Sequence, residues 1–221
     1  MKAIVKQEKI LSEIIDDLKV PAIAQIKALE LFLSTTASKI NPDEKDLIEL
    51  TLNSCNNMQN MIDNFSFISK LKNEKISISY KHFDFIGMLK KSLKEADILL
   101  KYSNLKLKLN LEHLKDVYAD EDKIKKAIDN MLSFAINASF KNSKLIISGL
   151  KIKEGIKFEI VFKSFRKNDD IIEIFNQNQQ YSSKYLQLFI AKEIIKAHFG
   201  KIIFKNYEDD MTVLGFLLPG C

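Results

Sequence analysis

The sequence predicts an α+β fold, in which an N-terminal antiparallel hairpin of two long helices precedes an α/β sandwich with a mixed sheet. Apolar residues recur at three- and four-residue steps through roughly the first 70 residues, as on helices. From residue 76 the pattern changes to short pieces with period two, as in strands. These pieces alternate with helical patterns, but without regular strand–helix–strand units. We therefore expect a helical dimerisation domain at 1–73 and a sandwich at 76–221.

The composition is that of a soluble globular chain. Apolar residues make up 46% of the 221 residues and charged residues 29%, which argues against disorder. Cys55 and Cys221 have neither metal-ligand spacing nor a disulfide framework, as expected in a reducing compartment. No uncharged stretch approaches the ~18 residues of a membrane span. We expect a cytoplasmic protein without a membrane span.

The charge pattern argues against a nucleic-acid partner. The net charge is +5, from 34 basic and 29 acidic residues. The two signs are interspersed along the chain, whereas nucleic-acid readers usually concentrate Lys and Arg on one element. We interpret the lysine surplus as solvated surface.

The first helix is predicted from about Val5 to Ile40, and Asn41-Pro42-Asp43 forms the turn that ends it. Proline cannot donate a helical hydrogen bond but suits the start of the next helix. The apolar stripe of this first helix consists of Leu11, Ile14, Ile15, Leu18, Ala22, Ile26, Leu29 and Leu33.

The second helix carries the clearest periodicity, with residues alternately four and three apart: Leu47, Thr51, Ser54, Met58, Met61, Phe65 and Ile68. Leu50, Leu52, Cys55, Ile62 and Leu71 widen this stripe. A seven-residue repeat in one of two helices joined by a short turn predicts an antiparallel hairpin with a bundle-type seam. One hairpin cannot cover so wide an apolar face, so we expect a homodimeric four-helix bundle.

The sandwich is predicted element by element. Alternation marks strands, Asp120 is a helix N-cap, and Gly200 is a helix C-cap. The predicted strands are Ile76–Tyr80, Leu105–Leu111, Val117–Tyr118, Leu145–Leu150, Lys157–Phe162, Ile202–Phe204 and Met211–Leu218, and the predicted helices are Phe85–Leu100, Asp120–Ala138 and Ser182–His198.

Three segments carry a family resemblance. Asp16-Asp17-Leu18-Lys19-Val20-Pro21 resembles an H-box, Asn130-Met131-Leu132-Ser133-Phe134-Ala135 an N-box, and residues 190–202 the segment after a second glycine box. In this order and on these elements, they resemble the transmitter of sensor histidine kinases of two-component systems. The resemblance covers nearly the whole chain. It implies a dimerisation and phosphoacceptor hairpin followed by a HATPase-type domain.

The chain departs from that family at the residues that carry its chemistry. The phospho-accepting histidine falls at Asp16, and the magnesium-binding asparagine falls at Phe134, whose ring offers no oxygen ligand. The basic residue expected one turn later is Asn137. The resemblance therefore implies a degenerate transmitter, a pseudokinase without autokinase activity.

Both glycine motifs of the family are also missing. Lys163-Ser164-Phe165 stands where Asp-x-Gly-x-Gly would follow a strand, and residues 183–188 read Ser-Lys-Tyr-Leu-Gln-Leu in place of the second glycine box. Glycines there let backbone amides approach phosphates, an approach that Tyr185 and Gln187 would obstruct. The lid between Phe175 and Ser182 is also short. We expect no cofactor, since ATP and Mg²⁺ binding are both predicted to be lost.

The histidines do not replace the missing phosphoacceptor. His82 and His113 flank strand patterns and His198 ends a helix. None lies in either long helix, and we interpret all three as structural or exposed.

The remaining chemistry implied by the resemblance is binding and dephosphorylation of a response regulator receiver domain. The family's phosphatase element follows the histidine, with an acid and then an amide or hydroxyl that orients water. Asp16, Asp17 and Gln25 are the candidate catalytic residues here, and the candidate partner-binding residues are Asp17, Val20, Pro21, Ala24 and Gln25. Val20 and Pro21 stand where the family has its amide or hydroxyl, so the pattern is incomplete.

Other functions stay open. A non-catalytic scaffold could sequester a receiver domain or a partner kinase. A phosphotransfer intermediate would need an exposed histidine on the hairpin, which the sequence lacks. An unrelated helical adaptor would be indicated by a hairpin that fails to dimerise.

Overall fold

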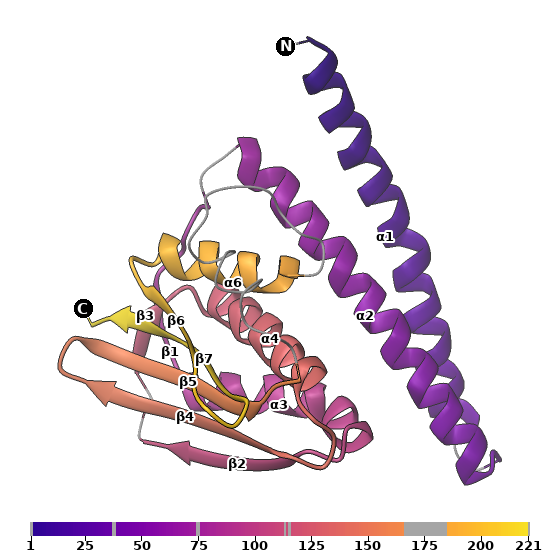
Figure 1. The fold of residues 1–221 in the computed structure, drawn as a ribbon. Helices are drawn as coiled ribbons and strands as arrows, with labels where there is room; N and C mark the ends of the chain where they lie inside the picture. Colours follow the sequence, from indigo (N-terminus) through magenta and orange to yellow (C-terminus); the bar gives the residue numbers. More distant parts are fainter. Residues whose placement is uncertain are drawn as a thin grey trace. The chain divides into compact units, whose positions relative to one another are not determined.

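The computed structural model describes residues 2–36, 39–73, 76–112, 114, 116–165 and 185–220. The chain divides into two compact units, Met1–Lys75 and Ile76–Cys221, which are drawn together in Figure 1. Each unit is described by itself.

Unit 1 is a helical hairpin of α1 (Lys2–Thr36) and α2 (Pro42–Asn73). Asn41 caps α2: its side-chain oxygen accepts the Glu44 N–H at 2.9 Å, and the Glu44 carboxylate accepts the Asn41 N–H at 2.9 Å. This reciprocal capping box satisfies two backbone donors that the first turn of a helix leaves unpaired. The predicted turn with a proline at the start of the second helix is confirmed.

The two helices pack along a narrow seam. Ile15, Ala22 and Ile26 of α1 are buried, as are Ile62 and Ile68 of α2. The four-and-three spacing of the α1 residues places them on one side of the helix, facing α2.

Most of the predicted seam of α2 does not face α1. Of its seven residues only Ile68 is buried, and the other six are exposed. Ile62, predicted only as a flanking residue, is buried inside the hairpin instead. Periodicity identifies an apolar stripe but cannot say which neighbouring helix covers it. We call the six exposed residues the outer stripe: Leu47, Thr51, Ser54, Met58, Met61 and Phe65.

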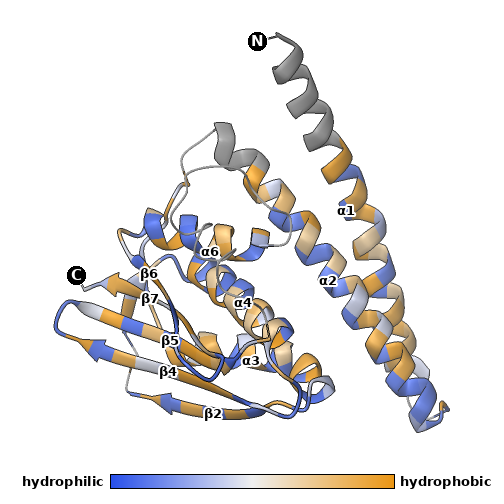
Figure 2. Ribbon diagram, viewed as in Figure 1, coloured by the Kyte–Doolittle hydropathy of each residue, from blue (hydrophilic) through white to orange (hydrophobic). Residues whose placement is uncertain are grey.

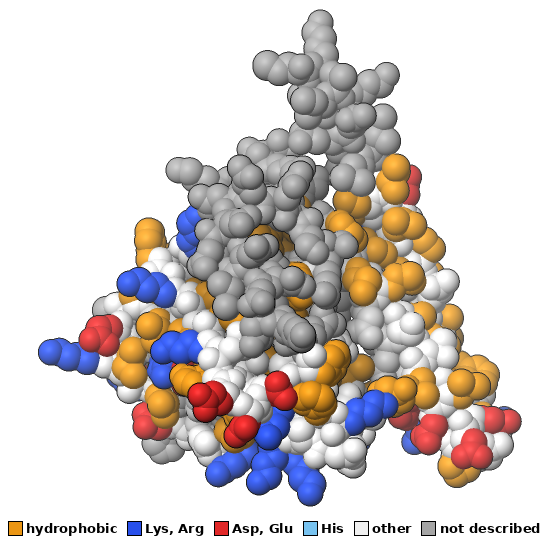
Figure 3. All heavy atoms as spheres, in the orientation of Figure 1, with side chains coloured by type: hydrophobic (Ala, Val, Ile, Leu, Met, Phe, Trp, Pro, Cys, Tyr) orange, Lys and Arg blue, Asp and Glu red, His pale blue; other side chains and the backbone are white. Residues whose placement is uncertain are grey.

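Apolar residues run along both helices of unit 1 (Figure 2) and form a broad apolar surface on the hairpin (Figure 3). Large exposed apolar residues of α1 add to the outer stripe: Ile14, Leu18, Val20, Ile23, Leu31 and Phe32. Exposed apolar surface of this extent is unusual in a soluble monomer and marks an interaction site.

Unit 2 contains a five-stranded mixed sheet in the order β2-β4-β5-β7-β6. β2 and β4 are parallel, and the other neighbours are antiparallel. The strands are β2 (Lys106–Leu111), β4 (Lys144–Ile152), β5 (Gly155–Lys163), β6 (Lys201–Asn206) and β7 (Met211–Pro219). β1 (Lys81–Phe83) and β3 (Val117–Ala119) form a separate antiparallel pair.

Three helices, α3 (Phe85–Tyr102), α4 (Glu121–Ala138) and α6 (Leu186–Ala197), lie on one face of this sheet (Figure 1). Phenylalanines fill the space between the two layers. Phe158 stacks on Phe216 at 5.1 Å between ring centroids and meets Phe85 edge-on at 6.0 Å. The predicted α+β architecture is confirmed.

One predicted strand is absent among the described residues. Ile76–Tyr80 is not a strand, and β1 begins only at Lys81. The Ser79 N–H donates to the Asp120 carboxylate at 2.9 Å, a side-chain partner that alternation cannot reveal. The predicted start of the last helix at Ser182 lies outside the described residues, as do His113, the lid at 175–182 and Cys221.

Gly200 has a different role from the predicted C-cap. Phe199 takes the left-handed conformation after α6, with φ +59°, and the Gly200 N–H donates to the Ile195 carbonyl at 2.9 Å. A Cβ on Gly200 would lie 2.5 Å from the Leu217 carbonyl oxygen. The glycine is therefore required by this close approach to β7 rather than by its φ.

Candidate functional site

The H-box-like segment lies in the middle of α1, where it joins a polar network between the two helices. The Lys19 ammonium is 4.0 Å from the Asp16 carboxylate and 3.3 Å from the Asp63 carboxylate of α2. Gln59 donates to Asp63 at 3.2 Å, and Lys19 donates to the Ser66 hydroxyl at 3.5 Å. Asp16 is exposed, so this network adds little to stability but fixes the charges at the phosphoacceptor position.

The five predicted partner-binding residues are all exposed on α1. We call them the docking face: Asp17, Val20, Pro21, Ala24 and Gln25. At 3.6 residues per turn they fall within an arc of roughly 140°, and Val20 is 71% exposed. Pro21 has no N–H to donate to the Asp17 carbonyl, so this face also offers a backbone acceptor.

The three candidate catalytic residues do not meet at one point. Asp16 and Gln25 are nine residues apart, which corresponds to opposite sides of the helix and about 13 Å along its axis. Asp17 lies about 12 Å from Gln25 along the axis but on an adjacent part of the surface. The geometry favours Asp17 over Asp16 as a partner of Gln25.

In unit 2, the position expected for the magnesium-binding asparagine is filled by an aromatic cluster. Phe134 of α4 is 4% exposed. Its ring lies 6.5 Å from that of Phe162 on β5 and 6.2 Å from that of Tyr185, which precedes α6. Tyr185 is also buried. Sequence reasoning named Phe134 and Tyr185 separately, but only the fold brings them together.

Other described residues near this cluster place side chains where the family's glycine motifs would leave the backbone accessible. Gln187 at the start of α6 donates to the Ser133 hydroxyl of α4 at 3.2 Å. After β5, Phe165 is exposed and meets Phe140 edge-on at 6.0 Å. Residues 166–184 lie outside the described part of the chain.

The comparisons with known proteins agree on the architecture. No protein-family profile matches the chain. It is 24% identical over 155 residues to the phosphate regulon sensor protein PhoR of Haemophilus influenzae, a match that covers 70% of this chain and 36% of PhoR. The chain therefore corresponds to about a third of that relative.

Two of the similar solved structures match nearly the whole chain, and a third matches unit 2 alone in extent. The Acinetobacter baumannii histidine kinase AdeS matches with a TM-score of 0.62 and 22% identity, over 88% of this chain and 94% of AdeS. Full-length ShkA, solved in complex with AMPPNP, matches with a TM-score of 0.67 and 14% identity, over 96% of this chain and 46% of ShkA. The catalytic domain of histidine kinase ThkA matches 64% of this chain and 97% of that domain, with a TM-score of 0.57 and 22% identity.

The chain has the fold of a histidine kinase transmitter. Its helical hairpin and HATPase-type domain follow each other in the expected order, which confirms the resemblance inferred from the motifs. Among the described residues, no helix of this transmitter is both long and apolar enough to cross a membrane.

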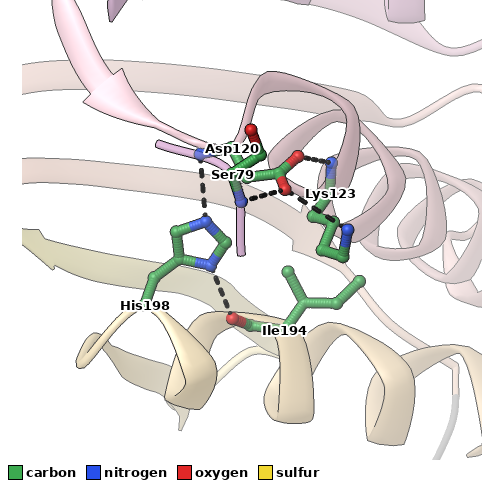
Figure 4. Close-up of polar contacts among 5 residues, drawn as sticks. All are labelled: Ser79, Asp120, Lys123, Ile194 and His198. Carbon is green, nitrogen blue, oxygen red and sulfur yellow. Dashed lines mark hydrogen bonds and ion pairs between the residues drawn. The ribbon is translucent and has the colours of Figure 1, made fainter. Parts of the chain in front are cut away.

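Unit 2 also holds a buried polar node that sequence reasoning missed, shown in Figure 4. The Asp120 carboxylate accepts the Lys123 N–H at 3.1 Å and the Ser79 N–H at 2.9 Å. The backbone N–H of Asp120 donates to Nε2 of His198 at 3.2 Å, and Nδ1 of His198 donates to the Ile194 carbonyl at 2.8 Å. Asp120 was predicted as an N-cap, but nothing in the sequence linked it to His198.

The node determines the protonation of both side chains. Burial lowers the pKa of His198 below its usual value, against the opposing effects of the Ile194 carbonyl and Asp120. A proton on Nε2 would also displace the hydrogen bond from the Asp120 N–H. Burial alone would raise the pKa of Asp120, but the hydrogen bonds from Ser79 and Lys123 outweigh burial and lower it. His198, predicted to be structural or exposed, is buried within this node.

His82 lies on the surface of β1. Its Nδ1 is 2.6 Å from the Asp116 carboxylate, and its ring lies 4.9 Å from that of Tyr118. Within the described residues, no three His, Cys, Asp or Glu side chains are placed to hold a metal ion.

Proposed function

We propose that this chain is a pseudokinase of a two-component system, which binds the receiver domain of a response regulator as a homodimer and controls its phosphorylation, as a phosphatase. The proposal rests on the transmitter fold combined with the residues at its reactive positions. In this proposal the chain has the family's docking and dimerisation surfaces but lacks its ATP-dependent chemistry.

The aromatic cluster is the observation that carries the proposal. Phe134, Phe162 and Tyr185 pack against each other where the resemblance expects an asparagine to bind magnesium. A hard cation such as Mg²⁺ requires oxygen ligands, which these rings do not offer. Phe134 and Tyr185 are buried, so the cluster contributes to the core and is not a vacant site.

The hairpin supports the rest of the proposal. The docking face presents Asp17 and Gln25 beside the exposed Val20. A side-chain amide can orient a water molecule for in-line attack on an aspartyl phosphate without covalent chemistry. The exposed outer stripe supplies the apolar surface that a second hairpin would cover.

Nucleotide binding is the first test. Addition of Mg-ATP should leave the melting temperature unchanged, because a ligand that does not bind the native state cannot stabilise it. A histidine kinase with an intact nucleotide site serves as the positive control. Micromolar ATP binding in calorimetry would contradict the pseudokinase proposal.

The phosphatase test uses the receiver domain of the response regulator encoded beside this gene. The receiver is phosphorylated with acetyl phosphate, the excess is removed, and its lifetime is followed with and without this protein. A shortened lifetime at substoichiometric protein is expected. Asp17→Ala and Gln25→Ala should lengthen it again while receiver binding survives through the rest of the docking face, whereas Lys27→Ala, an exposed change on the same helix, should not lengthen it.

The separation of the candidate catalytic residues favours a second function, a scaffold that sequesters the receiver domain. Asp16 and Gln25 lie on opposite sides of α1, so only Asp17 and Gln25 could cooperate. A scaffold would bind the phosphorylated receiver and leave its lifetime unchanged or longer. The lifetime experiment therefore separates the two functions directly.

A further inference from the structure

Strand register gathers lysines on the face of the sheet opposite the helices. The side chains that face α3, α4 and α6 are the buried apolar ones, such as Leu145, Phe158 and Leu214. Because side chains alternate along strands, the intervening residues point to the other side. Seven lysines point there, which we call the lysine face: Lys106, Lys108, Lys144, Lys157, Lys163, Lys201 and Lys205.

This face carries one acid within the strands. Glu159 forms an ion pair with Lys157 at 2.8 Å, and seven lysines against one carboxylate leave a surplus of six positive charges, compared with +5 for the whole chain. The acidic turn Glu208–Asp210 joins β6 to β7 and lies beside the end of β5, where the Ser164 N–H donates to the Asp210 carbonyl at 2.9 Å. Five of the seven lysines lie on β2, β4 and β5, and the other two lie on β6.

The lysines are also placed side by side. Lys106 and Lys144 are direct register partners, and Lys163 follows on the next strand because Leu145 pairs with Phe162. Neighbouring strands are about 4.8 Å apart, and like charges opposite each other destabilise a sheet. The row therefore does not stabilise the sheet, and an anionic partner would relieve the repulsion between these charges. In Figure 3, Lys and Arg side chains gather at the lower margin of the molecule.

We propose that the lysine face docks unit 2 onto an anionic phospholipid surface. The face contains aliphatic residues between the lysines, namely Ile146, Val161, Ile203 and Leu217, all of them half-buried. Lysine stems can lie over such residues while their ammonium groups reach outward, an arrangement that suits headgroups above an apolar layer. Lysines near an anionic leaflet contribute additively to binding.

The composition of the face disfavours other anionic partners. No aromatic residue of β2, β4, β5, β6 or β7 points to this side, since Phe158, Phe162, Phe204 and Phe216 share the register of the helix-facing side. Single-stranded nucleic acids are usually bound by stacking on aromatic side chains. Protein interfaces are depleted in lysine and enriched in arginine and aromatics, whereas this face is rich in lysine and has no arginine.

Vesicle flotation of the full chain tests the proposal. The protein should float with vesicles of phosphatidylcholine containing about 30% phosphatidylglycerol, should not float with phosphatidylcholine alone, and should be released by salt. The triple variant Lys106→Gln, Lys108→Gln, Lys144→Gln should bind about a hundredfold more weakly. Circular dichroism should show an unchanged fold, because the three side chains are exposed.

A matched control removes the same charge elsewhere in unit 2. Lys90, Lys91 and Lys94 of α3 are also exposed, and their triple glutamine variant should bind vesicles within a fewfold of the wild type. Equal losses in both variants would overturn the proposal, as would no binding to the anionic vesicles. Tight, salt-dependent binding to a DNA duplex without vesicle binding would overturn it in favour of nucleic acid.

Discussion

The two units use apolar residues in different ways. In unit 2 the apolar faces of the sheet and of three helices bury each other, and Phe158 is 0% exposed. In unit 1 the helices bury a narrow seam and leave the outer stripe uncovered, with Phe65 at 46% exposed. Unit 2 thus buries its apolar core within one chain, whereas unit 1 leaves exposed an apolar surface of the kind that is buried inside a four-helix bundle. Burial, rather than apolar composition, separates residues used for folding from those available for association.

The largest expected effect is the difference in stability loss between a Phe→Ala substitution in unit 2 and one in unit 1. Phe158→Ala should lower the free energy of unfolding of unit 2 by about 3–5 kcal/mol, because it removes a fully buried ring. Phe65→Ala should lower that of unit 1 by less than about 1 kcal/mol at concentrations where the chain is monomeric. Urea denaturation measures both, and equal losses would break the comparison.

The next effect concerns association of unit 1. Met61→Asp with Phe65→Asp places charges on the outer stripe and should raise the dimer Kd by at least about a hundredfold. Analytical ultracentrifugation across a dilution series gives this constant. Lys45→Asp, an exposed change near the turn, serves as the control. A wild-type chain that is monomeric at all concentrations would contradict the proposed four-helix dimer.

A pH titration of stability tests the contribution of the buried His198 to the core of unit 2. The pKa of His198 is lowered by burial, so the unfolded chain binds a proton at a higher pH than the folded one. The stability that neutral His198 contributes is present above the unfolded pKa of about 6.5 and is lost as the pH falls below it. Thermal unfolding of wild type and His198→Asn between pH 8 and pH 5 should show a weaker dependence in the variant.

Asp120 contributes in a lower range. Its pKa is lowered in the folded state, so its contribution is present above the unfolded pKa of about 3.9 and is lost as the pH falls below that value. For His198, a free energy of unfolding that does not change between pH 8 and pH 5 would contradict the lowered pKa of its imidazole.

The smallest effect is at the turn of unit 1. Asn41→Ala removes the oxygen that accepts the Glu44 N–H and should cost about 1 kcal/mol of helix stability. Asn41→Asp, which keeps the acceptor, should cost less. The helical circular dichroism signal during thermal unfolding reports both, and an equal loss for the two variants would assign the effect to something other than the cap.

The sequence alone determined the order of the elements and the type of fold. Helical periodicity, strand alternation, Pro42 and Asp120 identified most described elements to within a few residues, because these signals are local. The H-box and N-box patterns pointed to the transmitter before any coordinates. That Asp16 stands where the resemblance expects a histidine could likewise be read directly from the chain.

Only the tertiary structure decided which surfaces those elements present. The outer stripe was predicted as a bundle-type seam, and the structure shows that it faces away from α1, because an apolar stripe does not specify its partner. Phe134, Phe162 and Tyr185 come from three separate segments, and Asp120 meets His198 across 78 residues. The lysines looked interspersed along the chain, but strand register placed seven of them on one face. Such groupings depend on contacts between distant residues, which local sequence patterns do not contain.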